Sequence, residues 1–195
     1  MFYRLVFPVL WFAFIAFWIA MAWGGKAVAE RESVYSRLSH YLPLAVGIYL
    51  IAAPRLPIAA LSDRFAPLSL WLVQLGLALT VAGIAFAIWA RIRIAGNWSS
   101  DVTLKRDHEL IVDGPYAFVR HPIYTGILTG LLGTALAVGE WRALLGVAIA
   151  TGAYWRKLRI EERVMRRQFG EAYTRYTERV PALIPLLPSR GLQRT

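Results

Sequence analysis

The stretch GPYAFVRHPIYTG, residues 114–126, organises the whole chain, because it stands where a polar segment meets a long uncharged run. Arg120 and His121 lie at the mouth of that run, and ionisable groups placed beside hydrocarbon are costly unless they have a use. A second polar cluster follows one predicted helical hairpin later and contains Glu161, Glu162, Phe169, Gly170, Tyr173 and Tyr176. We expect the two clusters to meet on one face of a membrane and to form a single site.

The composition is that of a membrane protein. Of the 195 residues, 57% are hydrophobic, and the mean hydropathy is +0.47, whereas soluble domains contain about 45–50% apolar residues. The chain has 8 tryptophans and 9 tyrosines, and both residue types collect at bilayer interfaces. The sequence contains no cysteine, which excludes disulfides, thiolate nucleophiles and cysteine metal sites.

The net charge of +10 is explained by a membrane rather than by nucleic acid. Lys and Arg flank membrane spans on the cytoplasmic side and touch anionic headgroups, so membrane lipids are the expected contacts. The basic residues form no nucleic-acid recognition motif. The three histidines, His40, His108 and His121, are too far apart in sequence to indicate a metal site. We therefore expect neither nucleic acid nor a metal ion as a partner.

Uncharged runs predict an all-α integral membrane protein with about five transmembrane helices, since about 20 apolar residues span a bilayer as a helix. The second run is short or kinked, because Pro54 and Pro57 interrupt it before residues 58–61 resume. The predicted spans are Leu5 to Gly25, Tyr41 to Ala53, Phe65 to Ala90, Pro122 to Gly139 and Ala143 to Trp155. A signal peptide is the alternative for the first run, and only a weak cleavage site at residues 27–29 supports it.

Small residues and helix breakers predict the contacts and connections of these spans. Gly76 and Gly83 should let a neighbouring helix approach the third span closely. The predicted connections are a polar linker over Lys26 to His40, a turn at Asp113 to Pro115, a helix that continues to Gln168 and stops at Gly170, and a short helix over Glu171 to Arg179.

The distribution of Lys and Arg predicts the topology. Segment 91–121 holds 5 of them and the region from Arg156 onward holds 10, whereas the tip between the last two spans has only Arg142. Basic residues collect on the cytoplasmic side of a membrane. Both polar regions should therefore be cytoplasmic, and the tip and the amino terminus should lie outside.

The first cluster has the chemistry of an anion site. A His-Pro pair at a helix start places the imidazole near open backbone N–H groups, which favour anions. Arg120 is a permanent cation that can hold a carboxylate with two parallel hydrogen bonds, and Tyr116 and Tyr124 offer flat faces and hydroxyls. The alternative is an interfacial belt in which these side chains only touch lipid headgroups.

The second cluster places charges of both signs on one helix. Lys157 and Glu161 are four residues apart and share a face, whereas Glu161 and Glu162 point about 100° apart. The alternative is a solvated, salt-bridged helix, which the neighbouring arginines Arg159, Arg163, Arg166 and Arg167 would favour.

The two clusters are most specific when they are taken together. The first run contains His108-Glu109-Leu110-Ile111, Gly114-Pro115-Tyr116 and Val119 to Gly126. The second run contains Glu161-Glu162, Phe169-Gly170-Glu171, Tyr173, Tyr176, Val180-Pro181 and Ile184-Pro185. In its residues, order and spacing, this pattern resembles the isoprenylcysteine carboxyl methyltransferase family. The resemblance covers residues 97–185, and the first three spans show only the expected hydrophobic pattern.

The resemblance implies an integral-membrane methyltransferase that uses S-adenosylmethionine and acts on a lipophilic, isoprenylcysteine-like carboxylate that enters from the bilayer. Residues 1–90 would form three N-terminal spans, and residues 91–195 would form the catalytic region around hairpin 122–155. A cytosolic cofactor pocket would be built by segment 91–121 and the C-terminal helices. The implied cofactor-binding residues are His108, Glu109, Leu110, Ile111, Tyr116, His121, Pro122, Ile123, Tyr124 and Glu161.

The expected catalytic residues are Arg120, Lys157 and Glu161. A carboxylate acceptor is already ionised at pH 7, so a positive group that holds it is needed and a general base is not. Lys157 stands where the family has its substrate-contacting arginine; the charge is kept and the bidentate fork is lost. Arg156 is the neighbouring alternative for this role.

Three other functions stay open. A phospholipid amine methyltransferase would need a base, because its acceptor must lose a proton before it attacks. A membrane reductase would use a nicotinamide cofactor, and a non-enzymatic membrane protein would use the cluster only as an anchor. The positive charge suggests a bacterial inner-membrane protein whose site faces the cytoplasm.

Overall fold

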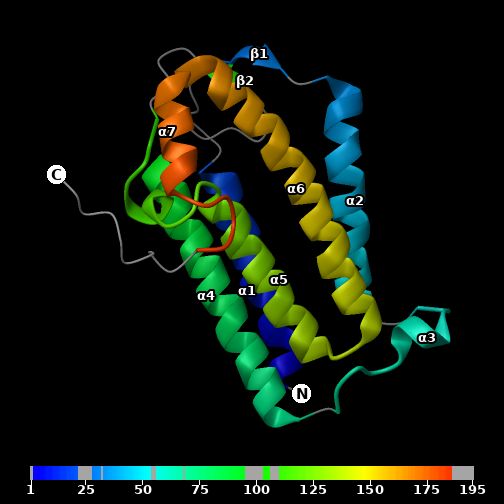
Figure 1. Ribbon diagram of the computed structural model, residues 1–195. Helices are drawn as coiled ribbons and strands as arrows, with labels where there is room; N and C mark the ends of the chain where they lie inside the picture. Colours follow the sequence, from blue (N-terminus) through cyan, green and yellow to red (C-terminus); the bar gives the residue numbers. More distant parts are fainter. Residues whose placement is uncertain are drawn as a thin grey trace.

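Long uncharged runs become long helices that lie side by side in an elongated bundle (Figure 1). The computed structural model describes residues 2–21, 28–31, 33–53, 56–67, 69–94, 103–105 and 110–185. Within these residues, the bundle helices are α1 (Phe2–Ala20), α2 (Val34–Ala52), α4 (Leu70–Ile94), α5 (Pro122–Val138) and α6 (Trp141–Phe169). Helix α7 (Glu171–Arg179) folds back beside the end of α6, and the short helix α3 (Ala59–Ser62) lies at the opposite end (Figure 1).

The all-α prediction missed one small sheet. Strand β1 (Val28–Arg31) pairs antiparallel with β2 (Thr103–Lys105), and the register is irregular between Val28 and Glu30. Strands of three and four residues are too short to show the alternation that predicts a strand. The pair joins the segment after α1 to the segment after α4, which are far apart in the chain.

One helix, α4, is long and apolar enough to cross a membrane by length and composition. Residues Leu5–Ala20 of α1 and all of α5 are shorter apolar helices. Within the part of the chain that the structure describes, no other helix meets both conditions. The predicted number of five spans therefore stays a prediction, although each predicted span lies on a separate helix.

Helix α2 corrects two predictions about the second run. It begins at Val34, inside the predicted polar linker, because the Ser33 side chain caps it and accepts a hydrogen bond from the Ser36 amide at 3.3 Å. Pro43 lies inside this helix and does not end it. After Ala52 the span does not resume at residues 58–61, which lead instead into the separate helix α3.

Helix α4 begins at Leu70, later than the predicted Phe65, because Pro67 disfavours helical backbone in the residue before it. The other predicted stops are confirmed: α6 runs unbroken to Phe169, and α7 covers the predicted range. Gly170 adopts φ +52°, a conformation that other residues rarely take. The predicted turn is the 3₁₀ helix η2 (Gly114–Ala117).

Helices α4 and α5 pack at very short range, as Gly76 and Gly83 predicted. A Cβ atom built on Gly126 would lie 2.7 Å from the backbone nitrogen of Ala87, and one on Gly133 would lie 2.7 Å from that of Thr80. The Thr80 hydroxyl lies 3.1 Å from the carbonyl oxygen of Gly130 across the interface. Small residues therefore allow the backbones to meet.

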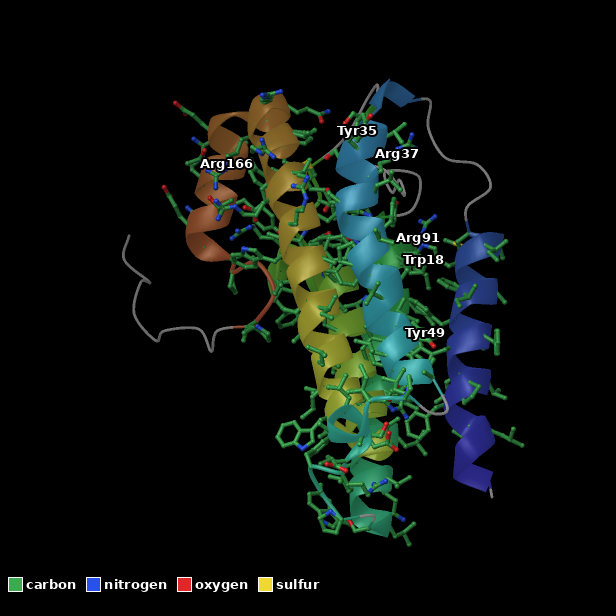
Figure 2. All side chains as sticks on the ribbon, turned by 90° about the vertical axis from the view of Figure 1, so that its right-hand side faces the viewer. Trp18, Tyr35, Arg37, Tyr49, Arg91 and Arg166 are labelled. Carbon is green, nitrogen blue, oxygen red and sulfur yellow. The ribbon has the colours of Figure 1, made fainter. Side chains whose placement is uncertain are left out.

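Helix α1 lies at the edge of the bundle. Figure 2 shows it separated from α2, with Trp18 beside Arg91 of α4. The Arg91 guanidinium is 5.8 Å from the centre of the Trp18 ring, and the Trp11 indole donates a hydrogen bond of 3.0 Å to the Thr134 hydroxyl. Its outer side chains stay exposed, for example Phe12 at 71%. This apolar face suits a lipid environment.

The two ends of the bundle differ. One end carries the end of α4, the start of α5 and the turn from α6 to α7 (Figure 1). The other end carries the first residues of α1, helix α3 and the tip at Gly139 (Figure 1). At this tip the Phe65 amide donates to the Gly139 carbonyl at 3.1 Å, and the Trp141 amide donates to the Asp63 carbonyl at 3.1 Å. The α5–α6 hairpin is therefore confirmed, and both polar clusters lie at the end away from its tip.

Candidate functional site

The C-terminal segment 180–185 holds the start of α5 in place. The Arg120 amide donates to the Pro181 carbonyl at 2.8 Å, and the His121 amide donates to the Ala182 carbonyl at 3.0 Å. The Thr125 hydroxyl donates to the Leu183 carbonyl at 2.7 Å. Backbone groups at a helix start need partners, and here a segment about sixty residues further along the chain supplies them.

Arg120 joins this helix start to α6 and α7. Its Nε donates to Glu162 Oε1 at 2.9 Å, and its Nη2 donates to the same oxygen. Its Nη1 donates to the carbonyl oxygens of Thr177, at 3.3 Å, and Val180. Both side chains of the ion pair are 11% exposed. Arg120 is thus bound within the protein rather than open toward an acceptor.

His121 lies between the two adjacent carboxylates of α6. Its Nδ1 is 3.4 Å from Glu161 Oε2, and its Nε2 is 3.4 Å from Glu162 Oε1. Burial of the imidazole lowers the pKa of His121, but hydrogen bonding to Glu161 and Glu162 outweighs burial, so the pKa is raised above its ordinary value. The protonated ring suits this position because both nitrogens then donate.

The two carboxylates stay ionised at neutral pH. Burial raises the pKa of Glu161, but its hydrogen bond from His121 and the charge of Lys157 lower it further, so the net shift is downward. For Glu162, His121 and Arg120 outweigh burial and lower the pKa to about 2. The Tyr124 hydroxyl also donates to Glu161 Oε1. The cluster is therefore a compact network of fixed charges of both signs.

Aromatic rings continue this network into the bundle. The Tyr124 ring stacks on His121 with centres 5.6 Å apart and planes 5° apart. The centre of the Tyr154 ring lies 4.7 Å from that of Tyr124. The Tyr176 hydroxyl of α7 donates to the Tyr116 carbonyl at 2.6 Å, which fixes η2 beneath α7.

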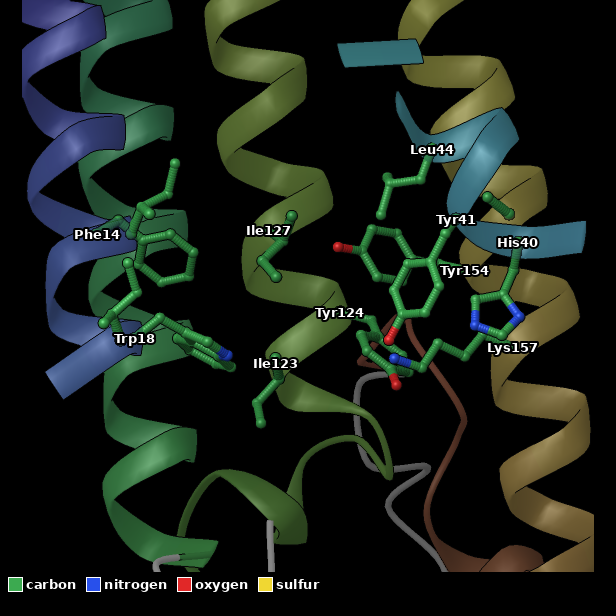
Figure 3. A pocket seen from close by; sticks show the side chains of 13 residues that line it. Phe14, Trp18, His40, Tyr41, Leu44, Ile123, Tyr124, Ile127, Tyr154 and Lys157 are labelled. Carbon is green, nitrogen blue, oxygen red and sulfur yellow. The ribbon is translucent and has the colours of Figure 1, made fainter. Parts of the chain in front are cut away.

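An apolar cavity of about 320 Å³ opens beside the network (Figure 3). Four helices, α1, α2, α5 and α6, contribute its walls. The lining residues are Phe14, Ile15, Trp18, Ile19, His40, Tyr41, Leu44, Ile123, Tyr124, Ile127, Ala153, Tyr154 and Lys157. The Lys157 ammonium lies 5.3 Å from the centre of the Tyr41 ring and 5.6 Å from that of Tyr124. One cation therefore faces a cavity that is otherwise mostly hydrocarbon and aromatic.

Arg156 and Lys157, the two alternatives for contact with the acceptor, have side chains that lie in different places. Arg156 is exposed, and its Nε donates to the Ser39 hydroxyl of α2 at 2.6 Å. Lys157 is 9% exposed and lines the cavity. The predicted shared face of Lys157 and Glu161 is confirmed, since both residues lie on the unbroken helix α6, four positions apart.

The structure brings most of the predicted site residues into one region. Arg120, His121, Tyr124, Lys157 and Glu161 belong to the network or the cavity. Of the other predicted residues, Ile123 lines the cavity and Pro122 is buried at the start of α5. Tyr116 and Ile111 pack together with Tyr124 in one apolar cluster. Leu110 is half-buried. His108 and Glu109 lie outside the described residues. The roles of all these residues stay predictions.

Several residues of this region had no predicted role. Glu162 holds both Arg120 and His121, and its position next to Glu161 was the signal that could have found it. His40, Tyr41 and Trp18 line the cavity from helices that show only a hydrophobic pattern. The predicted pocket of segment 91–121 and the C-terminal helices differs from this cavity, which is lined by the bundle helices, and that pocket stays a prediction.

Comparisons with known proteins support the resemblance. A family model described as phospholipid methyltransferase matches residues 71–172. The protein-S-isoprenylcysteine O-methyltransferase of Schizosaccharomyces pombe is 34% identical over 102 residues, which cover 51% of this chain and 43% of that protein. The cobalt-zinc-cadmium resistance protein CzcN of Cupriavidus metallidurans is 33% identical over 126 residues, which cover 62% of this chain and 51% of that protein.

A solved structure shares the fold. It is the eukaryotic intramembrane Ras methyltransferase ICMT, with a TM-score of 0.51 and 23% identity over 79% of this chain and 52% of that one. The chain spans about half the length of the curated relatives it matches. The matched residues 71–172 include all of α4 except Leu70, all of α5 and α6, and both polar clusters up to Gly170.

Proposed function

Since the chain belongs to the phospholipid methyltransferase family, we propose that it is an S-adenosylmethionine-dependent membrane enzyme that methylates the carboxylate of a lipophilic, isoprenylcysteine-like acceptor. The named relatives include isoprenylcysteine O-methyltransferases, and the fold is that of an intramembrane methyltransferase. The proposed location is a bacterial inner membrane, with the charged network on the cytoplasmic side.

One observation carries the proposal: Lys157 faces an apolar cavity directly beside the half-buried Glu161 and the buried Glu162. An acceptor with a hydrocarbon tail and an anionic head needs apolar walls and one cation near them. The lining provides both, because Lys157 is its one permanently charged side chain among the described residues. Exposed apolar side chains of α1, such as Ile15 and Ile19, border this cavity, so a tail would reach it from the bilayer.

The residues of the network fit the proposed cofactor. S-adenosylmethionine supplies a methyl group on a positively charged sulfur, together with a primary ammonium group. Glu161 is ionised, its side chain is 24% exposed, and it lies beside the cavity, so it can complement a positive group. The proposed contacts are Glu161, His121, Tyr124, Pro122, Ile123, Tyr116, Ile111 and Leu110, with His108 and Glu109 added from the sequence.

The reaction requires orientation more than proton transfer. The acceptor carboxylate is ionised near pH 7, so its oxygen attacks without a general base. Lys157 would hold that carboxylate in line with the methyl group, and the aromatic walls would exclude water. For Arg120 we propose a role other than contact with the acceptor, because Glu162 and two backbone carbonyls bind its guanidinium. We assign it to positioning Glu162 and His121.

A second candidate is methylation of a phospholipid amine, which the description of the matching family favours. An amine acceptor is protonated near pH 7 and must first transfer its proton to a base. The pKa values of Glu161 and Glu162 are both lowered, which makes these carboxylates weak bases. The carboxylate acceptor therefore fits the network better.

One experiment separates these functions. The purified protein in lipid nanodiscs receives S-adenosylmethionine with a labelled methyl group and either an S-prenylated cysteine with a free carboxylate or phosphatidylethanolamine. A methyl ester releases labelled methanol in mild alkali, whereas an N-methyl group does not. We expect alkali-labile label with the prenylcysteine. Alkali-stable label in the phospholipid would establish the amine reading, and absence of both products together with no S-adenosylhomocysteine binding would leave the non-enzymatic reading.

A further inference from the structure

Two nitrogen-bearing side chains reach the same cavity from facing helices. His40 comes from α2 and is 2% exposed, and Lys157 comes from α6 and is 9% exposed. Figure 3 shows His40 and Lys157 on the same side of the cavity, with the end of the lysine directed toward the rings of Tyr41 and Tyr124. The function proposed above uses Lys157 and leaves His40 without a role.

The positions of these two side chains are fixed by close packing of α2 against α6. A Cβ atom built on Gly47 would lie 2.6 Å from the Gly146 carbonyl oxygen, so the two backbones touch. Nearer the site, the Arg156 Nε donates to the Ser39 hydroxyl at 2.6 Å. Because each of these residues directly precedes one of the pair, this bond brings His40 and Lys157 to the same level of the bundle.

The ring of His40 is held in a defined orientation. Its centre lies 4.6 Å from that of the Tyr41 ring, at an angle of 51°. The Lys157 ammonium lies over the same Tyr41 ring, 5.3 Å from its centre. One tyrosine ring therefore lies near both nitrogen-bearing groups.

The chemistry of a carboxylate explains why two such groups are useful. Its two oxygens accept several hydrogen bonds, and inside an apolar cavity each oxygen needs a donor because solvent is excluded. A lysine ammonium is a compact charge that does not match both oxygens as a planar arginine does. An imidazole N–H on the facing helix provides the second donor without a second full charge.

From this arrangement we infer that His40 and Lys157 together bind the carboxylate of the acceptor, and that His40 determines specificity for a carboxylate over an uncharged head. This inference rests on the proposed function insofar as the cavity takes the acceptor. His40 lies on α2, before the residues that match the family model.

The test compares two ligands that differ only in their head. One is an S-prenylated thioether carboxylic acid, and the other is its carboxamide, each measured by equilibrium binding to the protein in nanodiscs. A hydrogen bond to a charged group contributes enough for about a tenfold effect on affinity. We expect the parent to prefer the acid by about tenfold or more, and His40→Phe to reduce this preference to about threefold or less.

Three variants make the result specific. His40→Gln keeps a side-chain N–H donor and should keep most of the preference for the acid. Leu44→Ala changes an apolar lining residue and should weaken binding of both ligands by the same factor, which leaves the preference unchanged. If His40→Phe fails to fold, His40→Leu is measured in its place, with S-adenosylhomocysteine binding as the check of an intact network.

The outcomes are distinct from those of the proposed function. An unchanged preference in His40→Phe, with the preference lost in Lys157→Ala, would mean that Lys157 alone binds the carboxylate and would overturn the inference. Parent protein that binds the acid no better than the amide would overturn it as well. A preference that depends on His40 in a protein that transfers no methyl group would support the carboxylate site and refute the methyltransferase.

Discussion

At the scale of single residues, Arg120 shows how one side chain can connect three parts of a chain. Its guanidinium contacts Glu162 on α6, the carbonyl of Thr177 on α7 and the carbonyl of Val180 beyond α7. His121, its neighbour, contacts Glu161 and Glu162. Because both side chains of the Arg120 ion pair are almost buried, removal of one partner leaves a charge that cannot be solvated.

Replacement of Arg120 by alanine should therefore destabilise the protein strongly. We expect Arg120→Ala to lower the free energy of unfolding by about 3 kcal/mol, because Glu162 and two carbonyls lose their donor. Reversible unfolding of the parent and the variant in mixed micelles measures this difference in the free energy of unfolding. The control is Arg175→Ala, which breaks an exposed ion pair with Glu171 and should have little effect. Equal losses in the two variants would contradict the structural role of Arg120.

The same network predicts how stability depends on pH. The pKa of His121 is raised in the folded state. Its contribution to folding stability is therefore fully present below its unfolded pKa of 6.5 and is lost as the pH rises through its folded pKa. The carboxylates have lowered pKa values in the folded state, so their contribution to stability is present above the unfolded value of 4.5 and is lost as the pH falls, for Glu162 toward about 2.

We therefore expect greatest stability between about pH 4.5 and pH 6.5, with a decline on the alkaline side that His121 causes. Thermal unfolding followed by circular dichroism from pH 4 to pH 9 measures the profile. In His121→Gln the alkaline decline should disappear, whereas a profile that keeps the same decline would assign it to another group.

At the scale of elements, two helix pairs set the frame of the site. Helices α4 and α5 touch through glycines, and α2 and α6 touch through Gly47 and Gly146. Since backbone contacts leave no room for adjustment, these pairs hold His121 at the start of α5 and Lys157 on α6 in fixed positions. Helix α1 has no such contact and is held by side chains such as Trp11 and Trp18.

A pair of glycine substitutions tests this frame. In Gly133→Ala the new methyl group would lie 2.7 Å from the Thr80 backbone nitrogen, and overpacking of this kind costs about 1–3 kcal/mol. Gly152→Ala is the matched control, because no atom lies within 4 Å of the added carbon, and it should stabilise α6 by up to about 1 kcal/mol. Midpoints of thermal unfolding should move in opposite directions, and a shift of equal sign would argue against tight α4–α5 packing.

At the scale of the whole molecule, the bundle separates two polar ends. Each end has its own group of polar contacts. The charged cluster lies at the end where α5 starts, and the tip with the backbone hydrogen bonds of Asp63, Gly139 and Trp141 lies at the other end (Figure 1). The counts of Lys and Arg predict that the first end is cytoplasmic. The proposed function needs this orientation, because S-adenosylmethionine would reach the charged network from the cytoplasm.

Single cysteines test this orientation, since the chain contains none. Asp63 and Glu178 are both exposed and lie at opposite ends. We expect a membrane-impermeant maleimide to label Asp63→Cys in intact cells and to label Glu178→Cys only after the membrane is opened. The reverse pattern would invert the topology and would place the charged network outside the cell. Folding of each variant is checked by S-adenosylhomocysteine binding.

Much of the architecture was predictable from local sequence features. Uncharged runs predicted the positions of the long helices, and Gly170 predicted the end of α6, because hydrophobic length and backbone freedom act within a few residues. Short strands and the early start of α2 were missed, since β1 and β2 have no periodic pattern and Ser33 starts a helix inside a polar segment. The two polar clusters could be recognised because their residues are grouped in sequence.

Composition and spacing thus predicted a membrane protein, the helical hairpin and two polar clusters on the same side of it. Only the tertiary structure decided that Arg120 binds Glu162, that Lys157 rather than Arg156 faces the cavity, and that His40 lines the same cavity as Lys157. These contacts join residues 42 to 117 positions apart. Which side chains meet over such separations depends on how glycine-lined helices pack against each other, and no local pattern contains that information.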